Sequence, residues 1–306
     1  MLDVRRLGLL RDLARLGTIA AVASARAYSP SAVSQQLALL QREAGVPLLE
    51  PDGRRVRLTP AGAALAGHAD TVLAELEAAA ATLAAARAGP SGTVRIGAFP
   101  SAVRTLLPGA LVALARDCPA LHLMVTELDP AAMPDALRGQ RLDVALLHDY
   151  DIEPSGPDPA LDSVPLLDET VFLAVPAGSA AAAGPAGDPV AAARDADWIL
   201  GSPGTLCHAA ALRACQQAGF MPRVRHHADD FVAVLALVAA GQGAALIPQL
   251  AAVQQPGGVT LLPLAARRRT RVACRRGAGA HPAVAACVAA LRAATAAYLG
   301  LPRPTP

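Results

Sequence analysis

The chain has 306 residues, a length typical of about two domains, and 53% of them are hydrophobic, which excludes wholesale disorder. Its formal net charge of +2 excludes a general polyanion binder, although the first sixty residues hold nine arginines against five acidic residues. Five widely spaced cysteines without a CxxC pair predict neither a disulfide framework nor a zinc ribbon. The N-terminus lacks the apolar run of a signal peptide, and glycine and proline break the most apolar later stretch. We therefore expect a cytoplasmic protein without a membrane span.

Residues 1–58 are predicted to form short helices and a hairpin. Leucines recur at helical spacing as far as Gly17, and Thr18 is a suitable N-cap for a second helix. Ser29 followed by proline is typical of the start of a third helix, which Gly45 ends. The pattern indicates a helical domain with a tight turn between its second and third helices.

The third predicted helix has two distinct faces. Val33, Leu37 and Leu40 follow the repeat of a buried stripe. Ser31 and Gln35 lie opposite, on a face that is polar and nearly free of acidic residues. Such a face is suited to close approach to another polar surface.

A PDG turn flanked by alternating residues predicts a β-hairpin that carries Arg54, Arg55 and Arg57. A helix with an exposed polar face, followed by a basic hairpin, is typical of a winged helix-turn-helix. In such a domain hydrogen-bonding side chains read base edges and arginines hold phosphates. The alternative is a helical domain with an arginine-rich turn and no role in DNA binding.

The segment 59–89 is predicted to form one long helix, because nearly every residue in it is a helix former. Leu65 and Val72 lie seven residues apart, as do Leu76 and Leu83, which is the spacing of a and d positions in a coiled coil. We therefore expect these four side chains to form a dimerisation seam. The alternative is an ordinary amphipathic helix that lies on its own domain.

After a GPSG break, residues 92–303 alternate between predicted strands and helices, the pattern of a parallel α/β fold. Their order indicates two lobes, with chain crossings near Leu147–Ile152 and again near Val259–Val272. VPLLDE and TVFLAVP are predicted as two separate strands. No nucleophile elbow, Walker loop, HExxH motif or Rossmann glycine pattern occurs, so we do not expect an enzyme.

The segment ARLGTIAAVASARAYSPSAVSQQLALLQREAGVPLLEPDGRRVRLTPAG resembles the N-terminal domain of LysR-type transcriptional regulators. The rest of the chain resembles that family in architecture. The resemblance implies an α plus α/β fold: a winged helix-turn-helix over 1–58, a long linker helix over 59–89, and a two-lobed α/β effector domain, similar to periplasmic binding proteins, over 92–303. It also implies a homodimer or homotetramer whose control of transcription responds to a small molecule bound between the lobes.

The resemblance places SPSAVSQQL on the recognition helix and so assigns base contacts to Pro30, Ser31, Ser34 and Gln35. Gln35 has the amide geometry for a bidentate contact to adenine. Contacts to DNA phosphates are expected from Thr18, Ser29, Gln36, Arg54 and Arg55. The family usually has an aromatic and a basic residue near the wing, where this chain has LLEPDGRR, and we expect Glu50 and Asp52 there to repel phosphate.

By the same resemblance, RIGAFPSA and GSPGTLCHAA lie across the cleft between the lobes. Each opens a predicted helix, and two helix N-termini that face one cleft suit an anionic group, although capped helices need the same residue types. Effector contacts are expected from Phe99, Pro100, Ser101, Asp149, Ser202, Thr205, Asp229 and Phe231.

The histidines and cysteines near this segment are candidate metal ligands by residue type: Cys207, His208, Cys215, His226 and His227. The two cysteines lie about two turns apart on one predicted helix, too far to bind one ion readily. We therefore expect no metal and no cofactor.

The expected partners are double-stranded DNA with an interrupted inverted repeat, a small-molecule effector for which an anionic group is suited, a second copy of the chain, and RNA polymerase. A different class of protein also fits the sequence. It is a small-molecule binding module whose helical domain contacts other proteins and not DNA.

Overall fold

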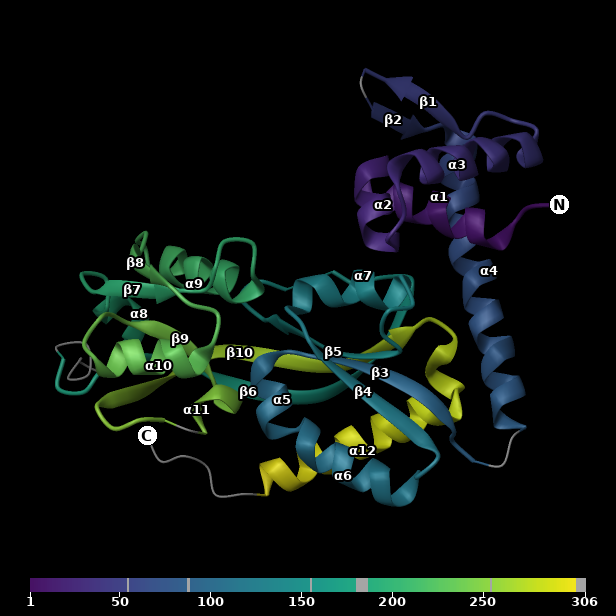
Figure 1. The fold of residues 1–306 in the computed structure, drawn as a ribbon. Coiled ribbons are helices and arrows are strands. Elements are labelled where there is room, and N and C mark those ends of the chain that lie inside the picture. The colour runs from purple at the N-terminus through teal and green to yellow at the C-terminus, as the bar shows by residue number, and fades with distance from the viewer. Residues whose placement is uncertain (54, 87–88, 155, 180–186, 254, 301–306) are drawn as a thin grey trace.

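The computed structural model describes residues 1–53, 55–86, 89–154, 156–179, 187–253 and 255–300. An N-terminal domain lies at one end of the long helix α4, and two lobes that share one six-stranded sheet form the rest of the molecule (Figure 1).

The N-terminal domain is built from three helices and a hairpin. Its helices are α1 (Val4–Leu16), α2 (Ile19–Arg26) and α3 (Pro30–Ala44). The stripe predicted on α3 is confirmed as buried, since Val33, Leu37 and Leu40 are at most 1% exposed. These side chains pack with leucines of α1 and Val22 of α2 in one apolar core.

The predicted helix caps are confirmed. The Thr18 hydroxyl accepts a hydrogen bond from the backbone N–H of Ala21 at 3.1 Å, and the Ser29 hydroxyl accepts one from Ala32 at 3.1 Å. Gly45 ends α3 with φ of 69°, a left-handed conformation that strains other residues. Both caps satisfy backbone donors that the first turn of a helix leaves unpaired.

The predicted wing is confirmed as an antiparallel hairpin of β1 (Leu49–Asp52) and β2 (Arg55–Leu58). Its register places Glu50 opposite Arg57 and Asp52 opposite Arg55. The Glu50 carboxylate forms an exposed ion pair with Arg57 at 2.8 Å. Each acidic residue of the wing therefore lies directly across from an arginine, which reduces the repulsion expected from the sequence. Arg54 lies outside the described residues.

Helix α4 (Pro60–Ala85) first belongs to the N-terminal domain and then runs along the C-terminal one. Ala66 and Ala69 are buried in the N-terminal core, and Leu65 packs against the same core. Leu65 is therefore in its own domain and does not continue the exposed stripe, which corrects its predicted place in the seam. The stripe itself consists of the exposed Val72, Leu76 and Leu83.

The first lobe places three parallel strands between layers of helices. The sheet order β4-β3-β5-β10-β6-β9 puts them at one side of the sheet. The strands are β3 (Gly92–Ala98), β4 (Leu121–Glu127) and β5 (Val144–Tyr150). The helices are α5 (Pro100–Thr105), α6 (Leu107–Asp117), η1 (Pro130–Ala132), α7 (Met133–Arg138), η2 (Ala278–Ala280) and α12 (Pro282–Leu299).

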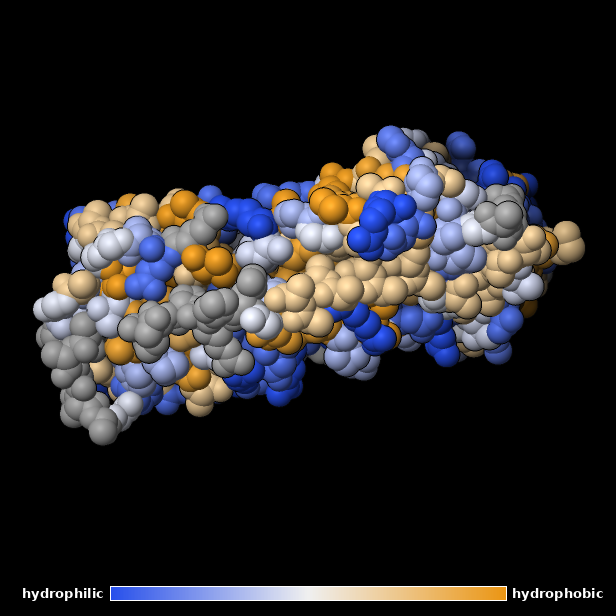
Figure 2. Space-filling model, turned by 90° about the horizontal axis from the view of Figure 1, so that it is seen from below, coloured by the Kyte–Doolittle hydropathy of each residue, from blue (hydrophilic) through white to orange (hydrophobic). Residues whose placement is uncertain are grey.

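Of the described helices, α12 is the one long and apolar enough to cross a membrane by length and composition. Its Cys287 and Leu291 are at most 1% exposed and pack in the core of the first lobe. Small apolar side chains cover much of the underside of the molecule, where α6 and α12 lie (Figure 2). The hydropathy of α12 is thus that of an alanine-rich helix with one face in a protein core.

The second lobe surrounds Trp198, which is fully buried. Its short parallel strands β7 and β8 form a separate sheet beside the edge strand β9. These strands are β7 (Asp197–Leu200), β8 (Arg223–His227) and β9 (Ala245–Pro248). Its helices are α8 (Pro189–Ala192), α9 (Leu206–Gln217), α10 (Phe231–Ala239) and α11 (Gln249–Ala252).

Two long antiparallel strands, β6 (Leu161–Pro176) and β10 (Val259–Arg275), pass through both lobes. The predicted second crossing lies within β10, but the first prediction is wrong, because Leu147–Ile152 comprises the end of β5 and a turn, and β6 makes the crossing. VPLLDE and TVFLAVP are one continuous strand. Asp168 and Glu169 lie between the two apolar runs, as polar residues at the end of a strand would. Glu169 is instead buried within β6, where it pairs with Arg268 of β10.

Glu169 and Arg268 form a buried ion pair where β6 and β10 cross between the lobes. The two are cross-strand partners, their side chains are at most 1% exposed, and Arg268 Nε lies 2.7 Å from Glu169 Oε1. The other Glu169 oxygen accepts the backbone N–H of Leu250 at 2.6 Å, and Arg268 Nη2 donates to Ser101 Oγ at 3.2 Å. One ion pair thus connects α5 of the first lobe with α11 of the second.

We expect Glu169→Ala to lower the stability of the two-lobed domain by about 3–5 kcal/mol, because it leaves the Arg268 charge buried without a counter-ion. Thermal or urea unfolding of the full chain measures the effect. Glu50→Ala is the matched control, since it removes the carboxylate of an exposed pair and leaves Arg57 in water. Equal unfolding midpoints for the two variants would show that the buried pair is not a stabilising junction.

Candidate functional site

The polar face predicted on α3 is exposed and free of the domain core. Ser31, Ser34 and Gln35 are exposed on the helix surface away from the buried stripe, and Pro30 is exposed at its first turn. Ser31 Oγ lies 3.0 Å from the capping Ser29 Oγ. The N-terminal half of α3 therefore presents short hydrogen-bonding side chains outward, as a helix in a DNA major groove requires.

The residues predicted at phosphates differ in how the domain holds them. Thr18 and Ser29 lie at the first turns of α2 and α3, and Arg55 is exposed on the wing. Gln36 is half-buried, and its side-chain oxygen accepts a hydrogen bond from Arg6 Nε at 2.9 Å. Gln36 thus helps hold α3 against α1 through its side-chain oxygen. The N–H groups of the same amide remain as donors for a DNA phosphate. Sequence reasoning overlooked Tyr28, which is 53% exposed in the turn before α3.

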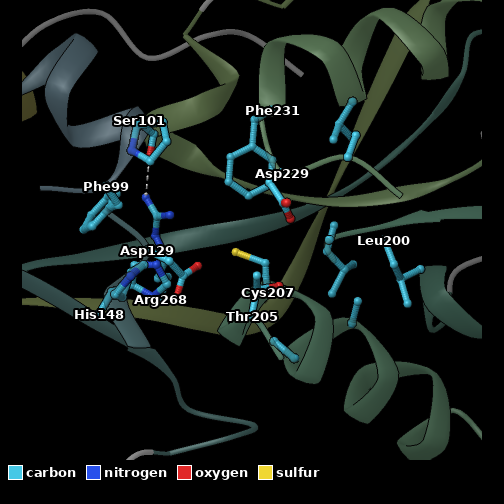
Figure 3. Close-up of a pocket in the computed structure, with 18 of the residues that line it drawn as sticks. Phe99, Ser101, Asp129, His148, Leu200, Thr205, Cys207, Asp229, Phe231 and Arg268 are labelled. Carbon is cyan, nitrogen blue, oxygen red and sulfur yellow. Dashed lines mark hydrogen bonds between the residues drawn. The ribbon is translucent and has the colours of Figure 1, made fainter. Parts of the chain in front are cut away.

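A cavity of about 230 Å³ lies between the two lobes and is lined by residues of both. Six predicted effector contacts line it: Phe99, Pro100, Ser101, Thr205, Asp229 and Phe231. In Figure 3, Phe231 and Asp229 lie on one side of the cavity and Phe99, His148 and Arg268 on the other. The cavity therefore combines aromatic and aliphatic walls with a small number of polar groups, which is the usual composition of a small-molecule site.

Asp149 was predicted at the cavity, and the structure corrects this. Neighbouring side chains of β5 point to opposite faces of the sheet, so His148 and Tyr150 line the cavity and Asp149 does not. Asp149 instead accepts a hydrogen bond from Arg271 Nη2 at 2.8 Å. The alternation of β5 in the sequence could have identified His148.

Ser202 is also not a lining residue, but it positions one. Its hydroxyl and backbone N–H donate to the Asp229 carboxylate at 2.6 and 2.7 Å. The helix α10 is capped by Asp230, whose carboxylate accepts the N–H of Val232, and not by Asp229. Asp229 is therefore oriented by the loop before α9 and remains at the cavity wall.

Arg268 and His148 are the main polar groups that sequence reasoning missed. The Arg268 guanidinium lies 4.8 Å from the centroid of the Phe99 ring, an arrangement that favours a cation–π interaction. The His148 ring packs edge-on between Phe99 and Tyr150, at centroid distances of 4.7 and 5.5 Å. Burial, and secondarily the Arg268 charge, lower the pKa of His148 well below its ordinary 6.5, so the imidazole is neutral at pH 7. Its Nδ1 is buried without a hydrogen-bond partner in the described chain.

Two further cavity groups are held in their protonated forms. The Tyr150 hydroxyl lies 3.4 Å from Cys207 Sγ. Burial raises the pKa of Tyr150 well above 10 and raises the pKa of the Cys207 thiol above its ordinary value. Cys215, on the same helix, is buried in the second lobe, and burial raises its pKa to about 12. Because the thiolate is the reactive form, neither thiol has the environment of a reactive cysteine.

Within the described chain, the histidines near the cavity do not form a set of metal ligands with neighbouring side chains. The rings of His208 and His227 stack at a centroid distance of 6.0 Å. The Nδ1 atom of each ring is hydrogen-bonded to the Gly201 carbonyl oxygen, at 2.9 and 3.0 Å. Among the residues that the structure describes, no group of three or more His, Cys, Asp or Glu side chains could hold a metal ion.

An ion pair connects the two lobes beside the cavity. Arg104 Nη2 of α5 donates to Asp230 Oδ1 of α10 at 2.5 Å, and it holds the pKa of Asp230 below its usual range. Both side chains are partly exposed, at 36% and 53%. The pair therefore bridges the lobes at a solvent-exposed position. If it breaks, both charged groups remain in contact with water.

Two family models match this chain. Residues 4–63 match the bacterial regulatory helix-turn-helix protein model of the lysR family, and residues 87–296 match the LysR substrate binding domain. A probable hydrogen peroxide-inducible genes activator of Mycobacterium avium is 34% identical over 230 residues, which cover 75% of this chain and 72% of the relative. The transcriptional dual regulator GltC of Bacillus subtilis is 29% identical over 223 residues, which cover 72% and 71%.

Solved structures share the whole fold. An OxyR C206 mutant of Corynebacterium glutamicum superimposes with a TM-score of 0.60 at 23% identity over 99% of this chain and 97% of that one. Full-length CbnR in complex with its target DNA gives a TM-score of 0.54 at 22% identity over 96% and 100%. These likenesses establish the arrangement of winged domain, linker helix and two lobes. Together with the two family models and the mycobacterial relative, they make the chain a member of the LysR family of DNA-binding transcriptional regulators, which carry an effector-binding domain.

Proposed function

We propose that α3 enters the DNA major groove and that Pro30, Ser31, Ser34 and Gln35 contact base edges. The exposed polar face of α3 beside an arginine-bearing wing is the observation that supports this assignment. Thr18, Ser29, Gln36 and the two wing arginines hold phosphates on either side of the groove. Two such domains in a dimer read an interrupted inverted repeat.

The apolar stripe Val72, Leu76 and Leu83 of α4 pairs two chains. These side chains are 38%, 48% and 73% exposed, which is unusual for a run of large apolar residues on one helix of a lone protomer. Pairing along α4 places both winged domains on the same DNA. A regulator assembled in this way acts in the cytoplasm, with RNA polymerase as the further partner.

The effector binds in the cavity between the lobes. Its apolar body contacts Phe231, Leu200 and Val234, and its polar end accepts hydrogen bonds from Ser101 and Arg268. Asp129, Asp229 and Glu127 also line the cavity, and Glu169 already neutralises Arg268. These charges disfavour a polyanion, so the anionic group expected from the sequence is limited to one, held by hydrogen bonds from Ser101 and Arg268.

Effector binding acts on the angle between the lobes. Residues of both lobes line the cavity, and the Arg104–Asp230 pair joins the lobes next to Asp229 and Phe231 of its wall. A ligand that contacts both walls binds the closed arrangement more tightly than the open one and so stabilises the closed arrangement. Closure changes the placement of α4 and the winged domains and so changes the contacts with DNA.

The mycobacterial relative is described as a peroxide-inducible gene activator, but the two thiols of α9, Cys207 and Cys215, favour a different signal. The Cys207 thiol lies 3.4 Å from the Tyr150 hydroxyl and has a raised pKa, and Cys215 is buried in the core of the second lobe. A peroxide-reactive thiol requires a lowered pKa. Reversible binding of a small acid fits these surroundings better than oxidation.

Replacing Gln35 by alanine tests base reading. We expect Gln35→Ala to weaken binding to the protein's own operator by about 1–3 kcal/mol and to leave binding to random DNA unchanged. Arg55→Ala serves as the contrast, because loss of a phosphate contact weakens both and reduces the salt dependence. Titrations at two salt concentrations measure these effects, and equal losses on both DNAs for Gln35→Ala would remove its role in reading bases.

Replacing Phe231 tests the effector cavity. A thermal-shift screen of small monocarboxylic acids against the full chain should find stabilising compounds, and Phe231→Ala should weaken their binding at least about tenfold through lost apolar contact. Val232→Ala is the matched control, because Val232 is the next residue of α10 and lies outside the cavity. Compounds that bind both variants with wild-type affinity would place the effector elsewhere.

The neutral His148 predicts a specific pH dependence. The unfolded chain takes up a proton near the ordinary pKa of 6.5, whereas the folded imidazole stays neutral, so stability is retained above pH 6.5 and falls below it. The loss is about 1.4 kcal/mol per pH unit for this one group. His148→Gln should remove this part of the acid sensitivity measured by thermal unfolding between pH 7.5 and 5.5, and the exposed His68→Gln should not. The same slope for wild type and His148→Gln would contradict the neutral buried imidazole.

A further inference from the structure

A second and larger cavity, of about 500 Å³, lies between the N-terminal domain, α4 and the first lobe. Its walls come from parts of the chain that the DNA and effector sites do not use. The lining includes residues of α1, α2 and α4 on one side and residues from β3, β10 and the segment after α7 on the other. Any molecule held there contacts both the DNA-binding and the effector-binding parts of the protein.

Arginines outnumber acidic residues in the lining of this cavity, although Arg11 and Arg26 are paired with Asp12, and Arg138 with Asp135 and Asp158, behind it. Six line it, namely Arg11, Arg26, Arg95, Arg138, Arg275 and Arg276, against the three carboxylates Asp70, Glu77 and Asp143. All three carboxylates have a nearby arginine, although Oδ1 of Asp70 is buried without a hydrogen-bond partner in the described chain. Arg275 bonds Glu77 at 2.6 Å and Asp143 at 3.4 Å, and Arg11 lies 3.9 Å from Asp70.

Arg95 and Arg276 have no such neutralisation. The side chain of Arg95 donates to the backbone carbonyl of Gln140 at 2.5 Å, and that of Arg276 donates to the carbonyl of Pro159 at 3.3 Å. Neither forms an ion pair within the described chain. Arg138, which is 5% exposed, adds an Nε atom that is buried without a hydrogen-bond partner in the described chain. Two guanidiniums without a carboxylate partner and one unsatisfied donor thus border the same cavity.

We propose that this interdomain cavity binds a small polyanion that carries two or more negatively charged oxygen groups. The planar guanidinium donates two parallel hydrogen bonds to phosphate or carboxylate, and two guanidiniums without a carboxylate partner, Arg95 and Arg276, favour a ligand with two negatively charged groups over a single carboxylate. The effector cavity disfavours such a ligand, since three carboxylates line it and its Arg268 is neutralised by Glu169. The protein therefore has two sites with different ligand classes.

The bound anion also favours one arrangement of the domains. In this structure the N-terminal domain lies against the first lobe, where Arg15 forms an ion pair with Asp135 at 2.5 Å and Glu77 of α4 with Arg275. A Cβ on Gly277, whose φ is 85°, would collide with the Ala74 carbonyl of α4, so the packing there is tight. A ligand whose site exists only while the two walls are together stabilises that arrangement.

Isothermal titration of the full chain with inorganic pyrophosphate and, separately, with citrate tests the proposal at constant ionic strength. We expect saturable binding of at least one of them, weakened tenfold or more in the double variant Arg95→Ala/Arg276→Ala. The control is Arg116→Ala/Arg213→Ala, which removes two exposed arginines that lie outside the cavity. Binding of pyrophosphate alone identifies a phosphate ligand, and binding of citrate alone a polycarboxylate.

No binding of either anion, or equal weakening in both double variants, would overturn the proposal. Circular dichroism and melting temperature of the Arg95→Ala/Arg276→Ala variant check that it folds, and Arg276→Gln alone gives a milder change if it does not. Phe231→Ala separates this site from the effector cavity. Pyrophosphate or citrate binding that is lost in Phe231→Ala would place the anion between the lobes and so would also overturn the interdomain site.

Discussion

The buried ion pair between Glu169 and Arg268 is the interaction on which the two-lobed domain depends. It lies where β6 and β10 pass from one lobe to the other, and its remaining hydrogen-bonding groups reach Ser101 and the backbone of Leu250. A buried charge without a counter-ion is strongly unfavourable, so neither strand can shift by one residue without large cost. The pair therefore fixes the register of the crossing and, with it, the positions of the cavity walls.

The same register decides which side chains the effector meets. Tyr150 lies opposite Arg268 and His148 opposite Thr270, so groups from β5 and β10 share one face of the sheet. Because these side chains are buried, the His148 imidazole is neutral, while the Tyr150 phenol and the nearby Cys207 thiol stay protonated. The cavity thus contains hydrogen-bonding groups of fixed protonation. Its charged groups are carboxylates at the wall and Arg268, which Glu169 neutralises.

Charge is distributed unequally over the molecule although its sum is near zero. The N-terminal domain carries the arginines of the wing, the effector cavity is bordered by carboxylates, and the space between the domains is bordered by arginines. Each region therefore selects a different partner: a DNA backbone, a singly charged small molecule and a small polyanion. The two small-molecule sites share the first lobe as a wall, which gives a physical route by which their occupancies influence one another.

The sequence by itself determined the helices, caps and wing of the N-terminal domain, because these depend on residues a few positions apart, such as Thr18, Ser29 and the PDG turn. It also located the two loops that border the cleft, and six of eight expected contacts line it. Tertiary structure alone decided the rest. The face on which Asp149 lies and the burial of Glu169 depend on strands paired over about a hundred residues of separation, as in the contact of Glu169 with Arg268. The hydrogen bonds of Ser202 to Asp229 also join separate segments, 27 residues apart. Local patterns cannot specify such partners, because a strand's buried face and register are set by the neighbour with which it pairs.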